Sequence, residues 1–289
     1  MSSGPVLYDV PGPDEKRRER RVSWVVGAVV IIVLAVLGWR LASNGVFDDR
    51  WRILFEAPPN FAGYQVQDIW SAVFRGLLNT LLAAVISLPL AMILAILLVS
   101  LRSAPWRGLR WLASAVIEVF RALPVVLVML FGILVLPGAS PLLAVVFGLV
   151  VYNAAVFAEI LRAGISALPA GQTEAAYSLG MRSGLIYRTI QLPQSVRMML
   201  PSLIAQGVVL IKDSSLGYIV GYAELLRQIS RVADALTNAD YLLPLLAVGA
   251  AVFVTLNVLL SRLAVWVQRH GRLQRRGARV ARTATLVEE

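Results

Sequence analysis

The chain has 289 residues but no cysteine and only one histidine, His270. Without cysteine it can have no disulfide framework, no thiolate metal site and no thiol nucleophile. The single histidine lies in an arginine-rich stretch near the end of the chain. The sequence therefore gives no support for a histidine-based metal site or a Ser-His triad, and we expect no metal site and no catalytic residues.

Lysine is almost as scarce, since the chain has only Lys16 and Lys212. Neither lies in the pattern G-x-x-x-x-G-K-[ST], whose glycines and lysine hold the phosphates of a nucleotide. We therefore expect no ATP or other cofactor in this chain, and no enzyme activity of its own. If ATP drives its function, ATP-Mg is bound by a partner ATPase.

Charge is also scarce: 15% of residues are charged and 58% are hydrophobic, with a mean hydropathy of +0.74. An ordinary soluble domain of this length is much less apolar. Uncharged stretches long enough to cross a bilayer recur along the chain. The sequence predicts an all-α integral membrane protein with six transmembrane helices, at 22–39, 76–101, from near 111 to 136, 141–158, 198–220 and 241–260.

Three of these spans needed a choice between alternatives. The first, Val22–Trp39, follows five basic residues and could be a cleaved signal peptide, but its length and the lack of a clear small-x-small site favour a retained span. The third and fourth lie in the uncharged run Ala122–Ala158, which is too long for one helix. Pro137 and Pro141 favour a turn between them.

The distribution of basic residues predicts the orientation of the spans. An even number of spans puts both termini on one side; that side holds 19 Lys and Arg residues and the other holds 6. The positive-inside rule then places both termini in the cytoplasm. The net charge of +10 is thus an orientation signal, with contact to anionic membrane lipids, and does not indicate nucleic-acid binding.

One polar segment between the fourth and fifth spans has a distinct pattern. From Glu174 to Pro193 it reads E-A-A-x3-G-x9-I-x-L-P. We expect Thr173 to cap a short helix that Gly180 ends in the left-handed conformation, followed by a second short helix. The segment is then a helix–turn–helix at the membrane surface. An interfacial helix without a partner is the alternative.

This pattern resembles the cytoplasmic coupling loop of permease subunits of bacterial ABC importers. The resemblance implies a loop, 163–197, that docks on a separate nucleotide-binding subunit. The residues that it assigns to ATPase coupling are Gly171, Gln172, Glu174, Ala175, Ala176, Gly180, Ile190, Leu192 and Pro193.

Other segments narrow the resemblance to the polar amino acid uptake family of ABC importers, the histidine, glutamate, glutamine and arginine type. They are Gly76–Leu81, Phe120–Pro124, Ala158–Ile165, Leu168–Gln172 and Lys212–Leu216, and the resemblance covers Gly76 to Leu260. The opening Val6–Pro13 and the extra first span are most similar to glutamate permease subunits of actinobacterial importers. The chain departs from the family at Ala122-Leu123, where members often carry Gly-Thr.

The resemblance implies a five-helix type I importer core plus one N-terminal helix, in the bacterial cytoplasmic membrane. It also implies as partners two ABC ATPase subunits, a second permease subunit (a related chain or another copy) and an extracytoplasmic amino-acid-binding protein. The substrate would be glutamate or glutamine, with a basic or other polar amino acid as the alternative. An ion-coupled secondary transporter is a rival function.

The predicted parts of the chain are a cytoplasmic segment 1–21, an extra helix 22–41, an extracytoplasmic loop 42–72, the transmembrane domain 73–266 and a basic cytoplasmic tail 267–289.

Charged residues within the spans are candidates for the substrate path. Such residues normally face protein or water, because charge in hydrocarbon is costly. Either interhelical packing or a polar lining of the path accounts for them. The candidate path residues are Asn79, Thr80, Lys212, Asp213, Ser214 and Ser215. Arg121, Glu159 and Arg162 are candidates for an inner gate or a packing cluster.

Overall fold

The computed structural model describes residues 13–45, 49–56, 65–236 and 241–285, and it has helices but no strand within those ranges. The all-α prediction is confirmed for these residues. Parts of the predicted segment 1–21, loop 42–72 and tail 267–289 lie outside them. The chain divides into two compact units, Met1–Ile53 and Leu54–Glu289.

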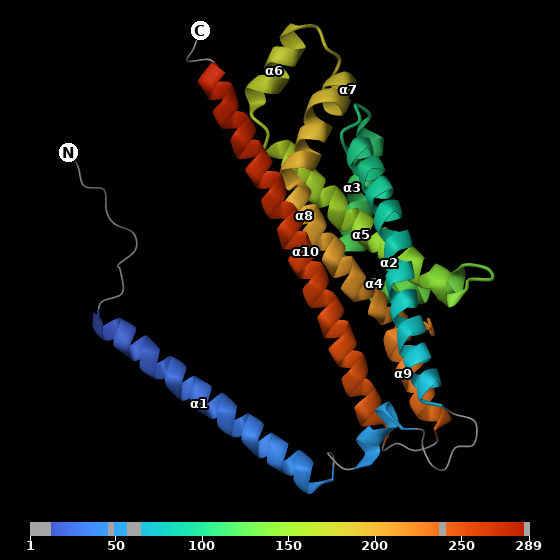
Figure 1. Ribbon diagram of the computed structural model, residues 1–289. Coiled ribbons are helices and arrows are strands. Elements are labelled where there is room, and N and C mark those ends of the chain that lie inside the picture. Colours follow the sequence, from blue (N-terminus) through green and yellow to red (C-terminus); the bar gives the residue numbers. More distant parts are fainter. Residues whose placement is uncertain (1–12, 46–48, 57–64, 237–240, 286–289) are drawn as a thin grey trace. The chain divides into compact units, whose positions relative to one another are not determined.

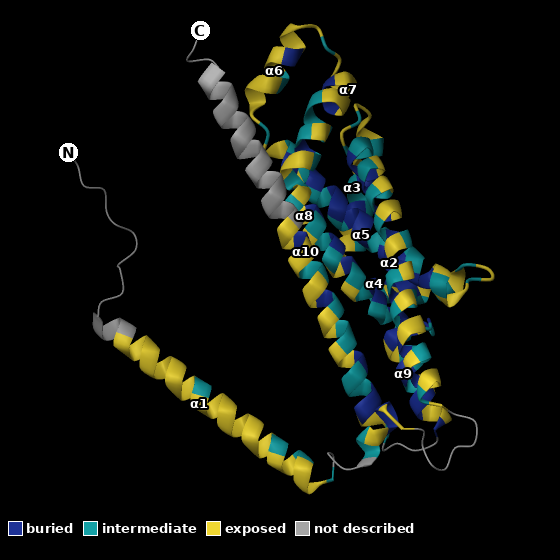
Figure 2. Cartoon of the chain, viewed as in Figure 1, coloured by how far each residue is buried: buried dark blue, intermediate teal, exposed yellow. Residues whose placement is uncertain are grey.

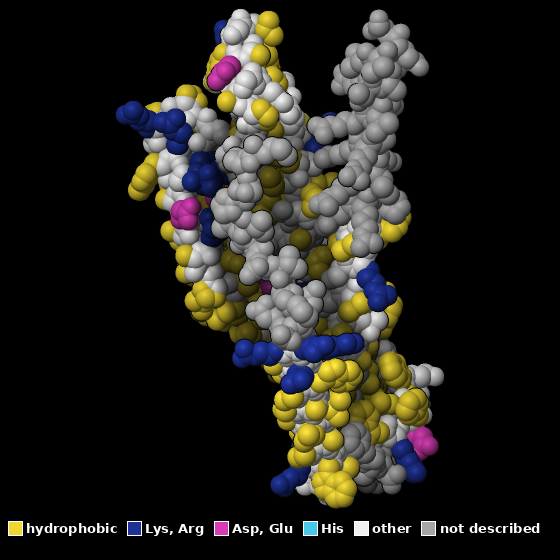
Figure 3. All heavy atoms as spheres, turned by 90° about the vertical axis from the view of Figure 1, so that its left-hand side faces the viewer, with side chains coloured by type: hydrophobic (Ala, Val, Ile, Leu, Met, Phe, Trp, Pro, Cys, Tyr) yellow, Lys and Arg dark blue, Asp and Glu magenta, His cyan; other side chains and the backbone are white. Residues whose placement is uncertain are grey.

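The first unit is built on helix α1, Pro13–Ser43. Its part from Arg17 to Ser43 is long and apolar enough to cross a membrane, which agrees with the predicted first span. Figure 3 shows arginine side chains gathered at one end of this hydrophobic stretch. This is the arrangement that the positive-inside rule uses to orient a span.

The second unit is a bundle of helices (Figure 1). The short helices α6 and α7 stand at one end of the bundle and α9 stands at the other (Figure 1). A 3-10 turn, Asp49–Leu54, precedes the bundle. In chain order the helices are α2 Val66–Arg102, α3 Arg107–Ala122, α4 Val125–Val135, α5 Pro141–Ser166, α6 Ala170–Ser178, α7 Ser183–Ile186, α8 Leu192–Asp213, α9 Leu225–Ala235 and α10 Leu242–Thr285.

Helix α5 is the centre of the bundle, because it packs against α2, α3, α4 and α8. Figure 2 shows buried residues concentrated on it. Ser140 caps its first turn by accepting a hydrogen bond from Leu143 N at 3.2 Å, and Pro141 occupies a first-turn position that needs no donor. A Cβ on Gly148 would lie 2.9 Å from Met129 N of α4. The close approach of these two helices therefore depends on glycine.

Buried and exposed residues recur along α2 with the periodicity of a helix, so the helix has a buried face and an exposed face. Its buried face carries small residues such as Ala84, Ala91 and Ala95. Its opposite face exposes large apolar side chains, among them Val85 at 67% and Ile93 at 65%. Large aliphatic side chains exposed in a continuous stripe match a lipid environment rather than water.

The predicted third span differs in shape from the observed one. The sequence predicts a span from near Trp111 to the turn at Pro137, whereas the structure has two helices, α3 and α4, bent by 105°. The break falls at Leu123 and Pro124, because a residue before proline avoids the helical region and Leu123 is extended. The described helices thus provide five candidate spans, or six if the bent pair is one span.

The last two spans begin and end differently from the prediction. Helix α8 ends at Asp213 and continues as a 3-10 turn, Ser214–Tyr218. Helix α10 does not end near Leu260 but runs to Thr285, and its part suited to crossing a membrane is Leu242–Trp266.

We predict that Gly76→Ala destabilises the bundle. A Cβ at this position would lie 2.7 Å from Leu225 Cα of α9, and backbone cannot move aside as a side chain can. We expect a loss of about 1–3 kcal/mol. The measurement is the thermal unfolding midpoint of the purified chain in detergent.

Gly207→Ala is the matched control, since its nearest neighbour is the flexible Leu88 Cδ1 at 3.4 Å. Equal midpoints for the two variants would contradict the close contact between α2 and α9.

Candidate functional site

The polar segment predicted as a helix–turn–helix forms α6 and α7. Helix α6 starts at Ala170, directly after Pro169. The prediction that Thr173 caps this helix is therefore wrong, because Thr173 lies inside it. Its hydroxyl instead accepts a hydrogen bond from Gln191 Nε2 at 3.2 Å, which ties α6 to the residue before α8.

Gly180 ends α6 in the left-handed conformation, as the sequence predicts, with φ +75°. Gly180 N donates to Tyr177 O at 2.8 Å, and Met181 N donates to Ala176 O at 3.1 Å. These two bonds form a Schellman motif, which satisfies the last carbonyls of the helix. A side chain at Gly180 would strain this conformation.

The outward face of α6 carries side chains without cover. Of the residues assigned to coupling, Glu174 and Ala175 are exposed while Ala176 is buried. Tyr177 is 53% exposed and Leu179 is 82% exposed. The sequence analysis did not select Tyr177 and Leu179, because the pattern specifies no residue type at their positions. Their apolar side chains between polar neighbours could have indicated an exposed contact surface.

The remaining coupling residues lie at the two ends of the segment. Gly171 and Gln172 are exposed in the first turn of α6. Ile190 and Leu192 are half-buried, and Pro193 is exposed in the first turn of α8. Leu192 packs against the core of the bundle.

A π-helical turn, Tyr187–Gln191, joins α7 to α8. Its Tyr187 is buried, and the Tyr187 hydroxyl lies 3.2 Å from Ser100 Oγ near the end of α2. The α6–α7 segment is thus linked by side chains to α2 as well as by the chain to α8. Movement of the segment can reach two long helices.

The candidate gate residues form one ionic cluster. Glu159 of α5 binds Arg162 of its own helix at 2.9 Å and Arg121 of α3 at 3.8 Å. It also binds Arg102 at the end of α2, at 3.2 Å. Sequence reasoning did not select Arg102, because no local pattern shows that it lies next to Glu159. One carboxylate therefore holds three helices together, with Glu118 3.6 Å from Arg121 at its edge.

Three of the candidate path residues lie in a buried junction. Asn79 Nδ2 donates to Ala223 O at 2.7 Å, and Thr80 Oγ1 accepts from Leu225 N at 3.3 Å. Ser214 Oγ lies 3.2 Å from Thr80 O. These bonds join α2 to the turn after α8 and to the start of α9.

The other three candidates lie elsewhere. Lys212 lines a groove between α8 and α10, and Ser215 lines a smaller cavity beside α9 together with Glu224. Asp213 is half-buried. Burial raises the pKa of the Glu224 carboxyl, against the opposing effect of hydrogen bonds from Leu226 N and Arg227 N.

Membrane components of binding-protein-dependent transport systems match the chain. The sequence profile of the family described as "Binding-protein-dependent transport system inner membrane component" matches residues 87–272. "Glutamate transport system permease protein GluD" of Corynebacterium glutamicum is 43% identical over 210 residues, which cover 70% of this chain and 76% of that protein. "Glutamate/aspartate import permease protein GltK" of Escherichia coli is 33% identical over 171 residues, which cover 55% and 76%.

A solved structure shares the fold. The crystal structure of an amino acid ABC transporter with histidines superimposes with a TM-score of 0.62 at 25% identity, covering 70% of this chain and 94% of that one.

We predict that Glu159→Gln loosens the contact between α2, α3 and α5. The change leaves three arginines close together without their shared carboxylate, and we expect a loss of about 2 kcal/mol in unfolding free energy, the size of a lost hydrogen bond to a charged group. Denaturant unfolding in detergent measures it.

Glu118→Gln serves as the control, because the Glu118 side chain is 60% exposed and contacts one arginine. If both variants unfold like the unaltered chain, the cluster does not hold the helices together.

Proposed function

The chain belongs to the family of binding-protein-dependent transport system inner membrane components, and on that premise we propose that it is the permease subunit of an ATP-driven importer of glutamate or glutamine. It is a multi-pass protein of the cytoplasmic membrane and an amino acid ABC permease by its relatives. The proposal adds the substrate and the route by which ATP hydrolysis drives transport.

The substrate proposal is supported by the relatives' names. The two relatives reported above are named for glutamate and for glutamate and aspartate. The superimposed structure was solved with histidines, which keeps a basic or other polar amino acid as the alternative.

The coupling proposal rests on one observation, the uncovered face of α6. In the cytoplasm, Tyr177 and Leu179 would leave an apolar surface in contact with water. A partner surface that covers them gains hydrophobic contact, and exposed Ala175 lets that surface approach closely. We propose that this partner is the ATPase and that α6 moves with it.

The movement would reach the spans through bonds described above. Gln191 and Thr173 connect α6 to α8, and Tyr187 and Ser100 connect the π-helical turn to α2. The ionic cluster around Glu159 includes Arg102, which lies two residues from Ser100 at the end of α2. We therefore propose that the cluster opens or closes the inner side of the path.

The complete importer would contain partners that this chain lacks. In the proposed assembly two ATPase subunits bind ATP-Mg, and an extracytoplasmic binding protein delivers the amino acid. A second permease subunit, either a related chain or another copy, completes the path.

The function is tested by uptake of labelled glutamate into proteoliposomes that hold the assembled complex. We expect uptake that requires ATP and the binding protein, with competition by glutamine or aspartate but not by arginine. ATP-dependent uptake of arginine or histidine instead would overturn the substrate, and uptake that ignored ATP would overturn the mechanism in favour of an ion-coupled carrier.

We predict that Gly180→Asp abolishes the stimulation of ATP hydrolysis by the loaded binding protein. A side chain at φ +75° strains the end of α6 and misplaces its uncovered face. Phosphate release by the reconstituted complex measures the stimulation.

Gly108→Asp is the control, since Gly108 of α3 is exposed and a Cβ there meets nothing within 4 Å. Full stimulation in the Gly180 variant would remove α6 from the coupling route.

A further inference from the structure

Two arginines and two tryptophans lie together on the surface at the start of α3. Trp106 is the residue before the helix, and Arg107, Arg110 and Trp111 lie in its first two turns. All four are exposed, Trp106 at 75% and Trp111 at 73%. Trp106 and Arg110 are four residues apart, as are Arg107 and Trp111, and this spacing makes side chains neighbours on a helix. We call these four residues the α3 patch.

The α3 patch lies at the end of the bundle that carries α6 and α7 (Figure 1). Only four residues separate α3 from α2, which ends at Arg102. Two residues before Arg102, Ser100 Oγ lies 3.2 Å from the Tyr187 hydroxyl in the turn after α7. The positive-inside rule assigns this end to the cytoplasm, where the membrane leaflet carries anionic lipids.

The α3 patch is positive and lacks a counter-charge among the described residues. The first turn of α3 contains no acidic residue. Within the described ranges no carboxylate lies within ion-pair distance of Arg107 or Arg110, whereas the arginines around Glu159 have one. Two exposed guanidinium groups three residues apart on a helix attract an anion, and the two parallel donors of a guanidinium match the oxygens of a phosphate.

The α3 patch borders an apolar surface. Leu112 and Val119 follow it on α3, seven residues apart on one face, and each is 54% exposed. Tryptophan is enriched where the acyl chains of a bilayer meet the headgroups, because its ring is amphipathic. A partner protein in water would leave Leu112 and Val119 uncovered. A phospholipid supplies both acyl chains for them and a phosphate for the arginines.

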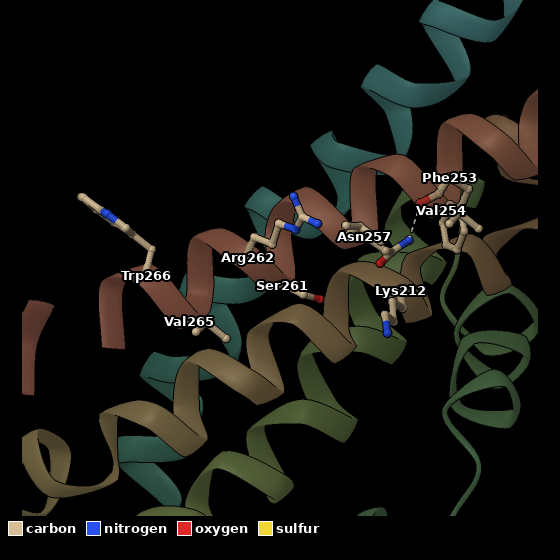
Figure 4. A pocket seen from close by; sticks show the side chains of 9 residues that line it. Lys212, Phe253, Val254, Asn257, Ser261, Arg262, Val265 and Trp266 are labelled. Atoms are coloured by element: carbon tan, nitrogen blue, oxygen red, sulfur yellow. Dashed lines mark hydrogen bonds between the residues drawn. The ribbon is translucent and has the colours of Figure 1, made fainter. Parts of the chain in front are cut away.

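Helix α10 repeats the spacing of arginine and tryptophan. Arg262 and Trp266 are four residues apart at the end of the candidate span Leu242–Trp266, and both are exposed. Figure 4 shows their side chains on the side of α10 opposite to Lys212. Helix α10 begins beside α9, at the other end of the bundle from α6, so its span ends toward the same end as the α3 patch.

We propose that the α3 patch binds the headgroup of an anionic phospholipid. The two arginines hold the headgroup phosphate, and the two indole rings lie at the boundary between headgroups and acyl chains. The acyl chains cover the apolar surface formed by Leu112 and Val119. The bound lipid thereby holds the start of α3 at the membrane surface, whichever amino acid the protein transports.

The bound lipid also stabilises the bundle. Helix α3 packs against α2 and α5, and Arg121 in its last turn contacts Glu159 of the ionic cluster. A ligand that binds the folded chain and not the unfolded chain raises the free energy of unfolding. Anionic lipid therefore raises the thermal unfolding midpoint through the α3 patch.

Fluorescence quenching by brominated lipid tests the proposal at the patch itself. Because the chain has no cysteine, Ser114→Cys provides a single thiol for a fluorophore. Ser114 lies seven residues after Arg107, so it is on the same side of α3 and roughly 10 Å farther along the helix axis. The labelled full chain is placed in phosphatidylcholine nanodiscs that contain a rising fraction of phosphatidylglycerol with brominated acyl chains.

We expect brominated phosphatidylglycerol to quench at a lower mole fraction than brominated phosphatidylcholine, because the α3 patch concentrates it. Arg107→Gln and Arg110→Gln should each raise the mole fraction needed for half-maximal quenching about fivefold, the effect of one basic residue near an anionic surface. The double variant should respond equally to the two lipids.

Two controls match the charge and the surroundings of the probe. Arg182→Gln combined with Arg188→Gln removes the same charge from exposed positions with no tryptophan within four residues, and should leave the quenching unchanged. A fluorophore on Ile93→Cys, on the exposed face of α2, should respond equally to the two lipids.

Equal quenching by the two lipids in the unaltered patch would overturn the proposal, and so would a preference that survives in the double variant. Loss of the quenching when the ATPase subunit binds would instead assign the patch to that subunit. In detergent without lipid, the double variant should unfold at the same midpoint as the unaltered chain. Added phosphatidylglycerol should raise only the midpoint of the unaltered chain, and an equal rise in both would also overturn the proposal. Because no measurement depends on transport, these results leave the proposed function untouched.

Discussion

The close packing of α5 is the constraint on which the rest of this structure depends. A bilayer supplies no hydrophobic force between helices, so contact has to come from shape. Gly148 and Gly164 let α4 and α8 approach α5 so closely that an added Cβ would overlap Met129 or Ser195. Ser195 uses this approach to donate a buried hydrogen bond to Leu161 O at 2.8 Å. The central helix thereby fixes the positions of the helices that carry both the ionic cluster and the groove.

The α6–α7 segment makes few contacts with the rest of the bundle. Helix α6 is held by its own Schellman motif and by the bond between Thr173 and Gln191, while the π-helical turn is held by Tyr187. A segment with few connections to the core moves at low cost in free energy. Its links lead to α2 and α8, and α8 forms one wall of the groove. We therefore propose that a movement of α6 reaches both long helices.

Local chemistry could be predicted from the sequence, whereas contacts between distant segments could not. The left-handed Gly180 follows from its place after a short helix, and the polar character of Lys212 within a span was visible as an exception. The cap at Thr173 was wrong because Pro169 starts the helix a turn earlier. The bend at Pro124 was missed because the turn at Pro137 already explained the long apolar run. Two results depend on packing across the bundle, which no local sequence pattern records. Asn79 and Thr80 lie apart from Lys212, and Arg102 contacts Glu159.

The proposed mechanism is that of a permease in which the surface segment α6–α7 passes its movement to the helices packed around α5. The most direct test is to place a photoreactive amino acid at Leu179 in the assembled complex and identify what it crosslinks. The account predicts crosslinks to the ATPase subunit, whose yield changes when ATP is added, because Leu179 is the most exposed apolar residue of the segment. Crosslinks to lipid alone, or none to the ATPase with or without ATP, would contradict the account.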